Sequence, residues 1–284
     1  MISTPEEIAY RVKAIQRRNP CYEKIAQWVG DLLSETVRFT YEFSMPGAGF
    51  NCKGLPDNWA KGQPLLDISS LSVDWNQAEN LYRRLVTMVG QTKMGQTQEE
   101  GLLKALANDQ KSSHKLMRAV LNSDLAPVES VAMDLTVDPS LLNILLRMSL
   151  RPALLKVAEA CRGYLDFGKW TKGHCPVCGS QPILAELSGD GGKRALHCSL
   201  CETVWPYPRL CCPFCDHDNP EGLGYLRPED EPGLRVDLCG NCGRYIKTID
   251  LREIEGPVIA PLDDVATWHL DLMVTDGMGL EGES

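Results

Sequence analysis

The feature that most constrains this chain is a set of four C-x-x-C pairs between residues 175 and 242. Nine of the twelve cysteines lie in that stretch, and eight of them form the pairs Cys175/Cys178, Cys198/Cys201, Cys212/Cys215 and Cys239/Cys242. A C-x-x-C turn, known as a metal knuckle, presents two thiolates to one metal ion, and two such knuckles complete a tetrahedral site. The sequence therefore predicts two four-cysteine metal sites.

The segments between the pairs indicate which pairs share a metal ion. After Cys178, "ILAEL", "SGDGG" and "KRALHC" read as strand, turn and strand, and they return the chain to its first knuckle. After Cys215, "GLGYLR", "PEDEPG" and "LRVDLC" do the same. Each second pair precedes another β-like run, "TVWPYP" or "RYIKTID", so the unit occurs twice. The predicted ligand sets are Cys175, Cys178, Cys198 and Cys201 for one metal, and Cys212, Cys215, Cys239 and Cys242 for the other.

Four neighbouring side chains are predicted to stay outside these sites. Cys211 falls one residue outside the repeat, His217 follows its knuckle by two residues, and His174 and His197 each abut a ligand. Because four thiolates already close a structural site, none of them is needed.

The residue after each C-x-x-C pair indicates which backbone conformation the knuckle can adopt. Gly179 and Gly243 stand there, and glycine tolerates the left-handed backbone that a tight metal knuckle needs. Glu202 and Asp216 occupy the equivalent positions of the other two pairs, where they fit that conformation less well.

The spacing does not name the metal, because zinc and iron both accept four thiolates in a tetrahedron. Zinc would be structural and redox-silent, whereas iron in a rubredoxin-like cage can change oxidation state. A thioredoxin-like dithiol is disfavoured, since no βαβ pattern surrounds any pair. The cysteine-rich region of about 80 residues is too small to bury a sufficient core alone, so its folding should depend on its metals.

Residues 1 to about 165 read as helical. Thr4, Pro5 and Glu7 are placed to start a first helix, and apolar side chains recur at helical spacing in residues 25–37, 75–91, 98–110 and 138–165. Pro152 is predicted to begin the last of these helices or to kink it. Residues 45–64, rich in Gly and Pro, predict a long loop.

We therefore expect an α+β chain with two domains. A helical domain should cover 1–168, and 169–284 should hold two tandem rubredoxin-like or zinc-ribbon four-cysteine modules followed by a C-terminal helix. That helix is expected to present Val265, Trp268, Leu272 and Met273 on one face. Asp263 and Asp264 lie near its start, where the helix dipole favours acidic side chains.

Composition and charge exclude several classes of function. The formal charge is −9, and residues 171–254 hold nine Lys/Arg against twelve Asp/Glu, a balance that disfavours nucleic acid as a partner. The first residues lack an apolar signal core, and the most apolar run, residues 141–150, is too short to cross a bilayer, so we expect a cytoplasmic protein without membrane insertion. Two closed metal sites and the lack of catalytic motifs indicate that the chain is not an enzyme.

Several motifs together resemble one family. "HCPVCGSQPILAEL", "RALHCSLCETVW", "CPFCD", "LCGNCGRYIKTIDL" and "LDDVATWHLDLMV" are similar to segments of the FdhE-type formate dehydrogenase accessory proteins. The resemblance is strong over residues 172–275. It implies a cytoplasmic assembly factor that binds the catalytic subunit of a formate dehydrogenase and supports its maturation, with iron favoured over zinc in both sites.

The same resemblance singles out Trp205, Tyr245, Asp263 and Asp264 as side chains that match family positions and are candidates to contact the client. Packing against the helical domain, or capping of the last helix, is an equally good expectation for each. A rubredoxin-like electron carrier or redox sensor is the alternative function, and a nucleic-acid-binding zinc ribbon is the third.

Three cysteines stand apart from the pairs. Cys21 and Cys161 are expected to be small buried hydrophobic residues, and Cys52 lies in the predicted loop with no partner.

Overall fold

The computed structural model describes residues 2–42, 59, 61–92, 95–106 and 110–280. Most of the predicted loop at 45–64, including Cys52, lies outside these residues. The chain divides into two compact units, one comprising Met1–Pro5, Asp31–Cys52 and Leu66–Arg162, the other Glu6–Gly30, Lys53–Leu65 and Gly163–Ser284. Neither unit is a single continuous stretch of sequence.

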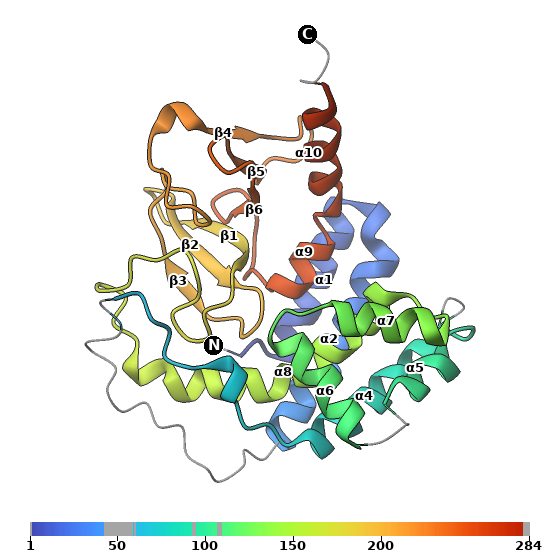
Figure 1. Cartoon of the computed structure of the whole chain (residues 1–284). Helices are drawn as coiled ribbons and strands as arrows, with labels where there is room; N and C mark the ends of the chain where they lie inside the picture. Colours follow the sequence, from blue (N-terminus) through green and yellow to red (C-terminus); the bar gives the residue numbers. More distant parts are fainter. Residues whose placement is uncertain (1, 43–58, 60, 93–94, 107–109, 281–284) are drawn as a thin grey trace. The chain divides into compact units, whose positions relative to one another are not determined.

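The first unit is helical. It holds α4 (Trp75–Gly90), α5 (Glu99–Ala105), α6 (Gln110–Leu121), α7 (Ala126–Leu135) and α8 (Pro139–Cys161), together with most of α2 (Glu23–Glu42) and the short 3₁₀ turn η2 (Ile68–Ser70). Helix α8 contacts α4, α6 and α7, and Figure 1 shows these helices gathered together. Asp74 and Asp138 cap α4 and α8 by accepting hydrogen bonds from backbone N–H groups of the first turn.

Helix α8 is the buried helix of this unit. Most of its residues are buried, in agreement with the many apolar residues of 141–155, where Asn143, Arg147, Ser149 and Arg151 are the polar exceptions. The helix runs through Pro152, so the prediction that a helix begins there is wrong. Because the buried side chains on either side of Pro152 hold both halves in the core, packing outweighs the lost backbone hydrogen bond.

The second unit is built on a six-stranded sheet with the strand order β3-β2-β1-β6-β5-β4. The strands are β1 (Pro182–Ser188), β2 (Lys193–Cys198), β3 (Val204–Pro206), β4 (Leu223–Leu226), β5 (Leu234–Cys239) and β6 (Tyr245–Asp250). Every segment predicted as β from the sequence forms a strand. Strands β1 and β6 pair in parallel, and all other pairs are antiparallel. The two hairpin units are therefore halves of one continuous sheet.

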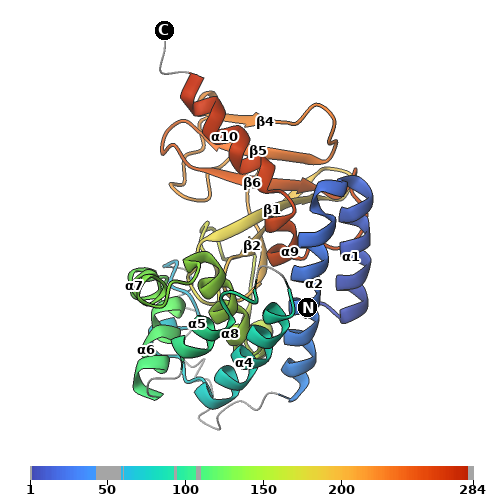
Figure 2. The ribbon, with the colours of Figure 1, turned by 90° about the vertical axis from the view of Figure 1, so that its right-hand side faces the viewer.

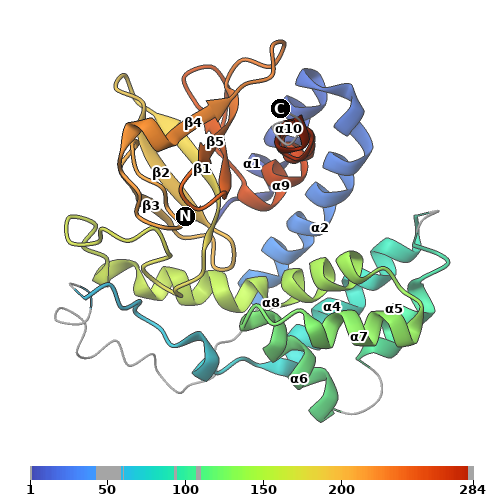
Figure 3. The same cartoon turned by 45° about the horizontal axis from the view of Figure 1, so that its top comes forward.

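One face of this sheet packs against helices. Leu184, Leu234, Val236 and Ile249 form a core with residues of α9 (Ala260–Val265) and α10 (Trp268–Leu280). Figures 2 and 3 show α9 and α10 on one side of the strands, with α10 crossing β5. The fold class is as predicted: an α+β chain with an N-terminal helical region, a sheet carrying the cysteine pairs, and C-terminal helices.

The predicted apolar face of the C-terminal helix is wrong for Trp268 and Leu272, although Met273 is partly buried and packs against the core. Leu270 and Val274 are buried, whereas Trp268 and Leu272 remain 65% and 62% exposed. The reason is a break after Val265, since α9 ends there and α10 begins at Trp268. A break of two residues shifts the helical phase, so a periodicity counted across it selects the wrong side.

Helix α1 (Pro5–Arg18) belongs to the unit of the sheet, although it is the first helix of the chain. It begins at Pro5, as the sequence predicts. Its Arg11 donates from Nε and Nη2 to the Asp263 carboxylate and from Nη1 to the carbonyl of Glu255. Residues from the two ends of the chain therefore share one core.

Candidate metal centres

The eight paired cysteines gather into two groups of four. The first contains Cys175, Cys178, Cys198 and Cys201, and the second contains Cys212, Cys215, Cys239 and Cys242. Within each group, all Sγ atoms lie within 4.8 Å of one another. This is the grouping predicted from the hairpin spacing.

The distances between sulfurs fit metal coordination and not disulfides. The Sγ–Sγ distance is 3.6 Å for Cys175–Cys201 and 3.4 Å for Cys178–Cys198. In the second group, Cys212–Cys242 and Cys215–Cys239 are each 3.7 Å apart. A metal–sulfur bond of about 2.3 Å in a regular tetrahedron places the sulfurs about 3.8 Å apart, whereas a disulfide needs about 2.05 Å. Both groups therefore suit a tetrahedral metal ion.

The backbone of each knuckle explains why the sulfurs converge. The first cysteine of each pair donates its N–H to the carbonyl five residues later, as in Cys175 to Ser180 at 2.8 Å and Cys212 to His217 at 2.8 Å. Backbone N–H groups also point at sulfur, with Val177 N 3.4 Å from Cys175 Sγ and Leu200 N 3.3 Å from Cys198 Sγ. Such N–H groups stabilise thiolates before any side chain contributes.

The residue after each pair adopts the left-handed conformation in all four knuckles. The φ angle is 76° at Gly179 and 68° at Gly243, and it is 57° at both Glu202 and Asp216. The left-handed conformation expected from the sequence is therefore present in every knuckle. At Glu202 and Asp216, which are not glycines, it costs about 1–2 kcal/mol. These two residues are held there by the surrounding knuckle geometry.

The two groups differ in exposure. All four cysteines of the first group are buried, whereas in the second group Cys215 is exposed and Cys242 is partly exposed. In the metal-free protein, burial raises the pKa of Cys175 and Cys198 well above that of an ordinary thiol. A hydrogen bond from Asn241 lowers the pKa of Cys215 to about 6. A cation in the first group would remove the cost of burying thiolates.

Two polar side chains beside the sulfurs were not identified from the sequence. Asn241 Nδ2 donates to Cys215 Sγ at 3.5 Å, and Thr203 Oγ1 lies 3.1 Å from Cys201 Sγ. Asn241 stands inside the fourth C-x-x-C and Thr203 stands two residues after the second. Polar residues at these positions of a knuckle are the signal that would have pointed to them.

The four side chains predicted to stand outside the sites belong to neither four-sulfur group among the described residues. Cys211 Sγ lies 3.2 Å from the hydroxyl of Tyr207, and it belongs to neither four-sulfur group. His174 Nε2 lies 2.9 Å from the carbonyl of Gly62, and His197 Nε2 lies 2.8 Å from a carboxylate oxygen of Glu186. His217 also belongs to neither group.

The candidate partner residues make internal contacts. Trp205 is buried and donates from Nε1 to the carbonyl of Lys172, and Asp263 is fully buried against Arg11. Tyr245 donates its hydroxyl hydrogen to Asp271 at 2.9 Å, and Asp264 pairs with the Lys247 ammonium at 2.7 Å. Trp205 and Asp263 therefore present almost no surface to a partner in this fold.

The two described isolated cysteines differ from one another. Cys161 is buried in α8, as expected. Cys21 is exposed, so the expectation that it is buried is wrong. It lies in the 3₁₀ turn Pro20–Tyr22, where the helical spacing that would bury it is interrupted.

Comparison with known proteins finds similarity to proteins named FdhE. A family model described as "FdhE, central domain" matches residues 174–209, which include the whole first group. A protein named "Protein FdhE homolog" from Aquifex aeolicus is 24% identical over 265 residues, covering 92% of this chain and 87% of that protein. A protein of the same name from Serratia proteamaculans is 30% identical over 224 residues, covering 76% of this chain and 67% of that protein.

A solved structure shares the fold of this chain. The crystal structure of the FdhE protein from Pseudomonas aeruginosa superposes with a TM-score of 0.66 at 21% identity, covering 98% of this chain and 93% of that one. Among the helices of the described residues, none is both long and apolar enough to cross a membrane.

Proposed function

The chain belongs to the FdhE family, and on that premise we propose that it is an accessory factor that binds the catalytic subunit of formate dehydrogenase and supports its maturation in the cytoplasm. It does so as a binding protein and not as an enzyme. Its two metal ions, with iron favoured and zinc possible, hold the binding unit in shape.

The observation that carries the proposal is the completeness of both four-cysteine groups. Each supplies four sulfurs at tetrahedral spacing, so a bound metal has no open position for water or substrate. A closed tetrathiolate site contributes to folding directly, since metal binding and local folding are one equilibrium. Both sites sit on one continuous sheet, which gives the unit a rigid surface for a protein partner.

Co-purification tests this proposal. Tagged wild-type protein should retain the catalytic subunit of formate dehydrogenase and two metals per chain. The double variant Cys175→Ser/Cys178→Ser should lose one metal per chain and retain little of the catalytic subunit, because one half of the sheet loses the metal ion that stabilises it. Cys211→Ser is the matched control, since it removes a neighbouring sulfur outside both groups and should change neither value.

The outcomes separate the parts of the proposal. Full client binding by the double variant would place the docking surface away from the metal-bearing sheet. Loss of a metal in Cys211→Ser would overturn the ligand assignment. If wild-type protein retained no catalytic subunit, the accessory function itself would be wrong.

Electron transfer is a second candidate function, and the exposure of the second group favours it. Cys215 lies at the surface and Cys242 is partly exposed, so an iron ion there would lie close to a redox partner. A ferric tetrathiolate protein is red and bleaches reversibly on reduction, whereas a zinc protein is colourless. A colourless protein containing only zinc, purified from anaerobic cells, would eliminate electron transfer and leave client binding untouched.

A further inference from the structure

A cavity lies on the sheet face opposite to the helices, beside the second cysteine group. Cross-strand register places Arg235, Asp237 and Cys239 of β5 on this face, with Tyr225 of β4 opposite Asp237. The segment 209–214 lines the other side, and the cavity, which is partly open to solvent, has a volume of about 150 Å³. A water molecule in the liquid occupies about 30 Å³, so the cavity has room for a group of several heavy atoms.

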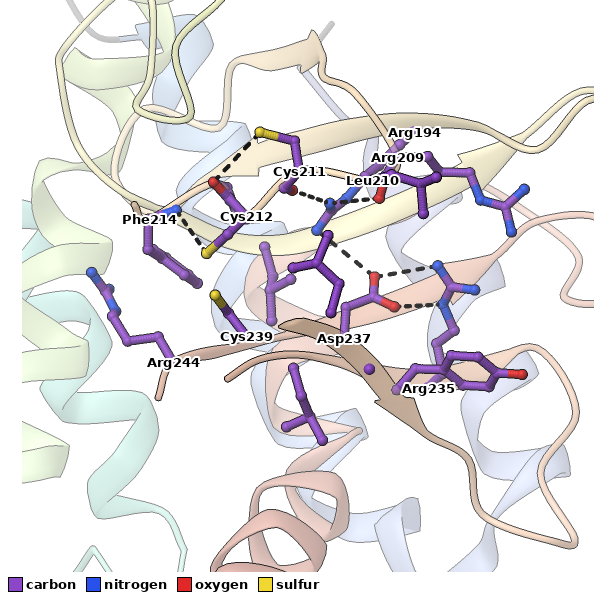
Figure 4. A pocket seen from close by; sticks show the side chains of 16 residues that line it. Arg194, Arg209, Leu210, Cys211, Cys212, Phe214, Arg235, Asp237, Cys239 and Arg244 are labelled. Carbon is purple, nitrogen blue, oxygen red and sulfur yellow. Dashed lines mark hydrogen bonds and ion pairs between the residues drawn. The ribbon is translucent and has the colours of Figure 1, made fainter. Parts of the chain in front are cut away.

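The lining of this cavity is strongly cationic. Arg194, Arg209, Arg235 and Arg244 line it, and Asp237 is the only acidic residue among them. Figure 4 shows Arg194 and Arg235 pointing at the Asp237 carboxylate from opposite sides. The Arg235 Nη2 donates to Asp237 Oδ2 at 3.3 Å, and its Nε lies 2.9 Å from Oδ1. The Asp237 carboxylate thus forms ion pairs with two guanidinium groups, and its distances to Arg235 are the shorter ones.

Arg194 is left with unused donors. Its side chain is 2% exposed, and its Nη1 donates to the carbonyl of Cys211 at 3.1 Å. Its Nη2 lies 3.7 Å from Asp237 Oδ2, too far for a hydrogen bond. Neither Nε nor Nη2 has a hydrogen-bond acceptor among the described residues. Burying donors of a charged group without acceptors costs several kcal/mol, so a ligand that accepts from them is strongly favoured.

The two unused donors lie on one edge of the guanidinium. Nε and Nη2 form the edge that binds two oxygens of an oxyanion in parallel. A phosphate monoester carries a charge of about −1.5 to −2 at neutral pH and three acceptor oxygens. It therefore suits the Arg194 and Arg235 guanidinium groups, which share a single carboxylate, better than a monovalent carboxylate does. Apolar side chains such as Leu210, Phe214 and Ile246 complete the walls and suit the organic part of an ester.

We propose that this cavity is a binding site for a phosphoryl group, held by the Nε and Nη2 edge of Arg194 and by Arg235. The ligand is either inorganic phosphate or a small phosphate ester, and the apolar walls favour the ester. This inference does not depend on the proposed function or on the identity of the metals.

Titration calorimetry with the metal-loaded full chain tests it, with phenyl phosphate, inorganic phosphate and benzoate as the probes. Wild-type protein should bind phenyl phosphate more tightly than inorganic phosphate, and benzoate most weakly. Arg194→Gln should weaken phenyl phosphate binding about 10–100-fold, the effect of losing a charge-assisted bidentate contact. Lys193→Gln is the matched control, because it removes the same charge from the adjacent exposed position of β2, and it should leave binding unchanged.

Metal content per chain is measured on every variant, since Cys212 and Cys239 also line the cavity. If Arg194→Gln loses a metal or fails to fold, Asp237→Asn decides the question. Removing the competing carboxylate should tighten phenyl phosphate binding by about fivefold or more. Unchanged affinity in Asp237→Asn, no binding of either phosphate by wild-type protein, or benzoate binding as tightly as phenyl phosphate would each overturn the proposal.

Discussion

Arg11 and Asp263, 252 positions apart in the chain, form an ion pair in which neither side chain has exposed surface. The Arg11 Nη2 lies 2.6 Å from Asp263 Oδ1. Asp263 also accepts from the backbone N–H of Ile259 at 2.7 Å, so it ties α1 to the start of α9. An ion pair of this kind fixes one arrangement of the two helices, because either charge alone would be buried without a partner.

Asp263→Asn should therefore destabilise the sheet-bearing unit by about 3–5 kcal/mol, because the Arg11 charge stays buried without a counter-ion. The measurement is the free energy of unfolding in urea, followed by circular dichroism. The control is Lys169→Met, which removes an exposed pair with Asp166 and should cost less than about 1 kcal/mol. Equal effects of the two substitutions would show that the buried pair has no special role.

The two metals should leave the protein at different rates. A chelator and a thiol reagent reach the second group first, because Cys215 is exposed there while all cysteines of the first group are buried. Release from wild-type protein should be biphasic. The variant Cys175→Ser/Cys178→Ser should retain only the fast phase. A single slow phase in that variant would contradict the assignment of rates to sites.

Backbone strain at the fourth knuckle gives a third prediction. A Cβ added at Gly243 would meet no atom within 4 Å, so Gly243→Ala costs only the left-handed conformation, about 1–2 kcal/mol. Gly224→Ala is the control, since that strand position is equally open and has no positive φ. Thermal unfolding of the metal-loaded protein should begin at a lower temperature in Gly243→Ala and not in Gly224→Ala. The same loss in both variants would point to a contact and not to strain.

The two faces of α10 should respond differently to truncation. Leu270 is fully buried in the core with the sheet, so Leu270→Ala should cost about 2–5 kcal/mol. Leu272 is 62% exposed, and Leu272→Ala should change stability by less than about 0.5 kcal/mol. Urea unfolding of both variants is the measurement. A large loss in Leu272→Ala would restore the helix face expected from the sequence.

Much of the candidate site could be predicted from local sequence. Metal knuckles are short-range structures, since the ligands of one pair are three residues apart and the backbone bonds that shape them span five residues. The hairpins between Cys178 and Cys198 and between Cys215 and Cys239 are also local, which is why the grouping of sulfurs follows from spacing. The face of α10 could not be predicted this way, because a short break at Ala266 and Thr267 resets the helical phase.

The sequence by itself determined the eight clustered cysteines, their two groups and all six strands, because each depends on neighbours within one hairpin. Only the tertiary structure decided that β1 pairs in parallel with β6, that Arg11 meets Asp263, and that Arg194 and Arg235 share Asp237. These pairings join residues far apart in the chain, and no periodicity or spacing encodes them. They are selected by the packing of the whole unit, in which the buried Arg11 pairs with Asp263 and β1 and β6 join the two hairpin units into one sheet.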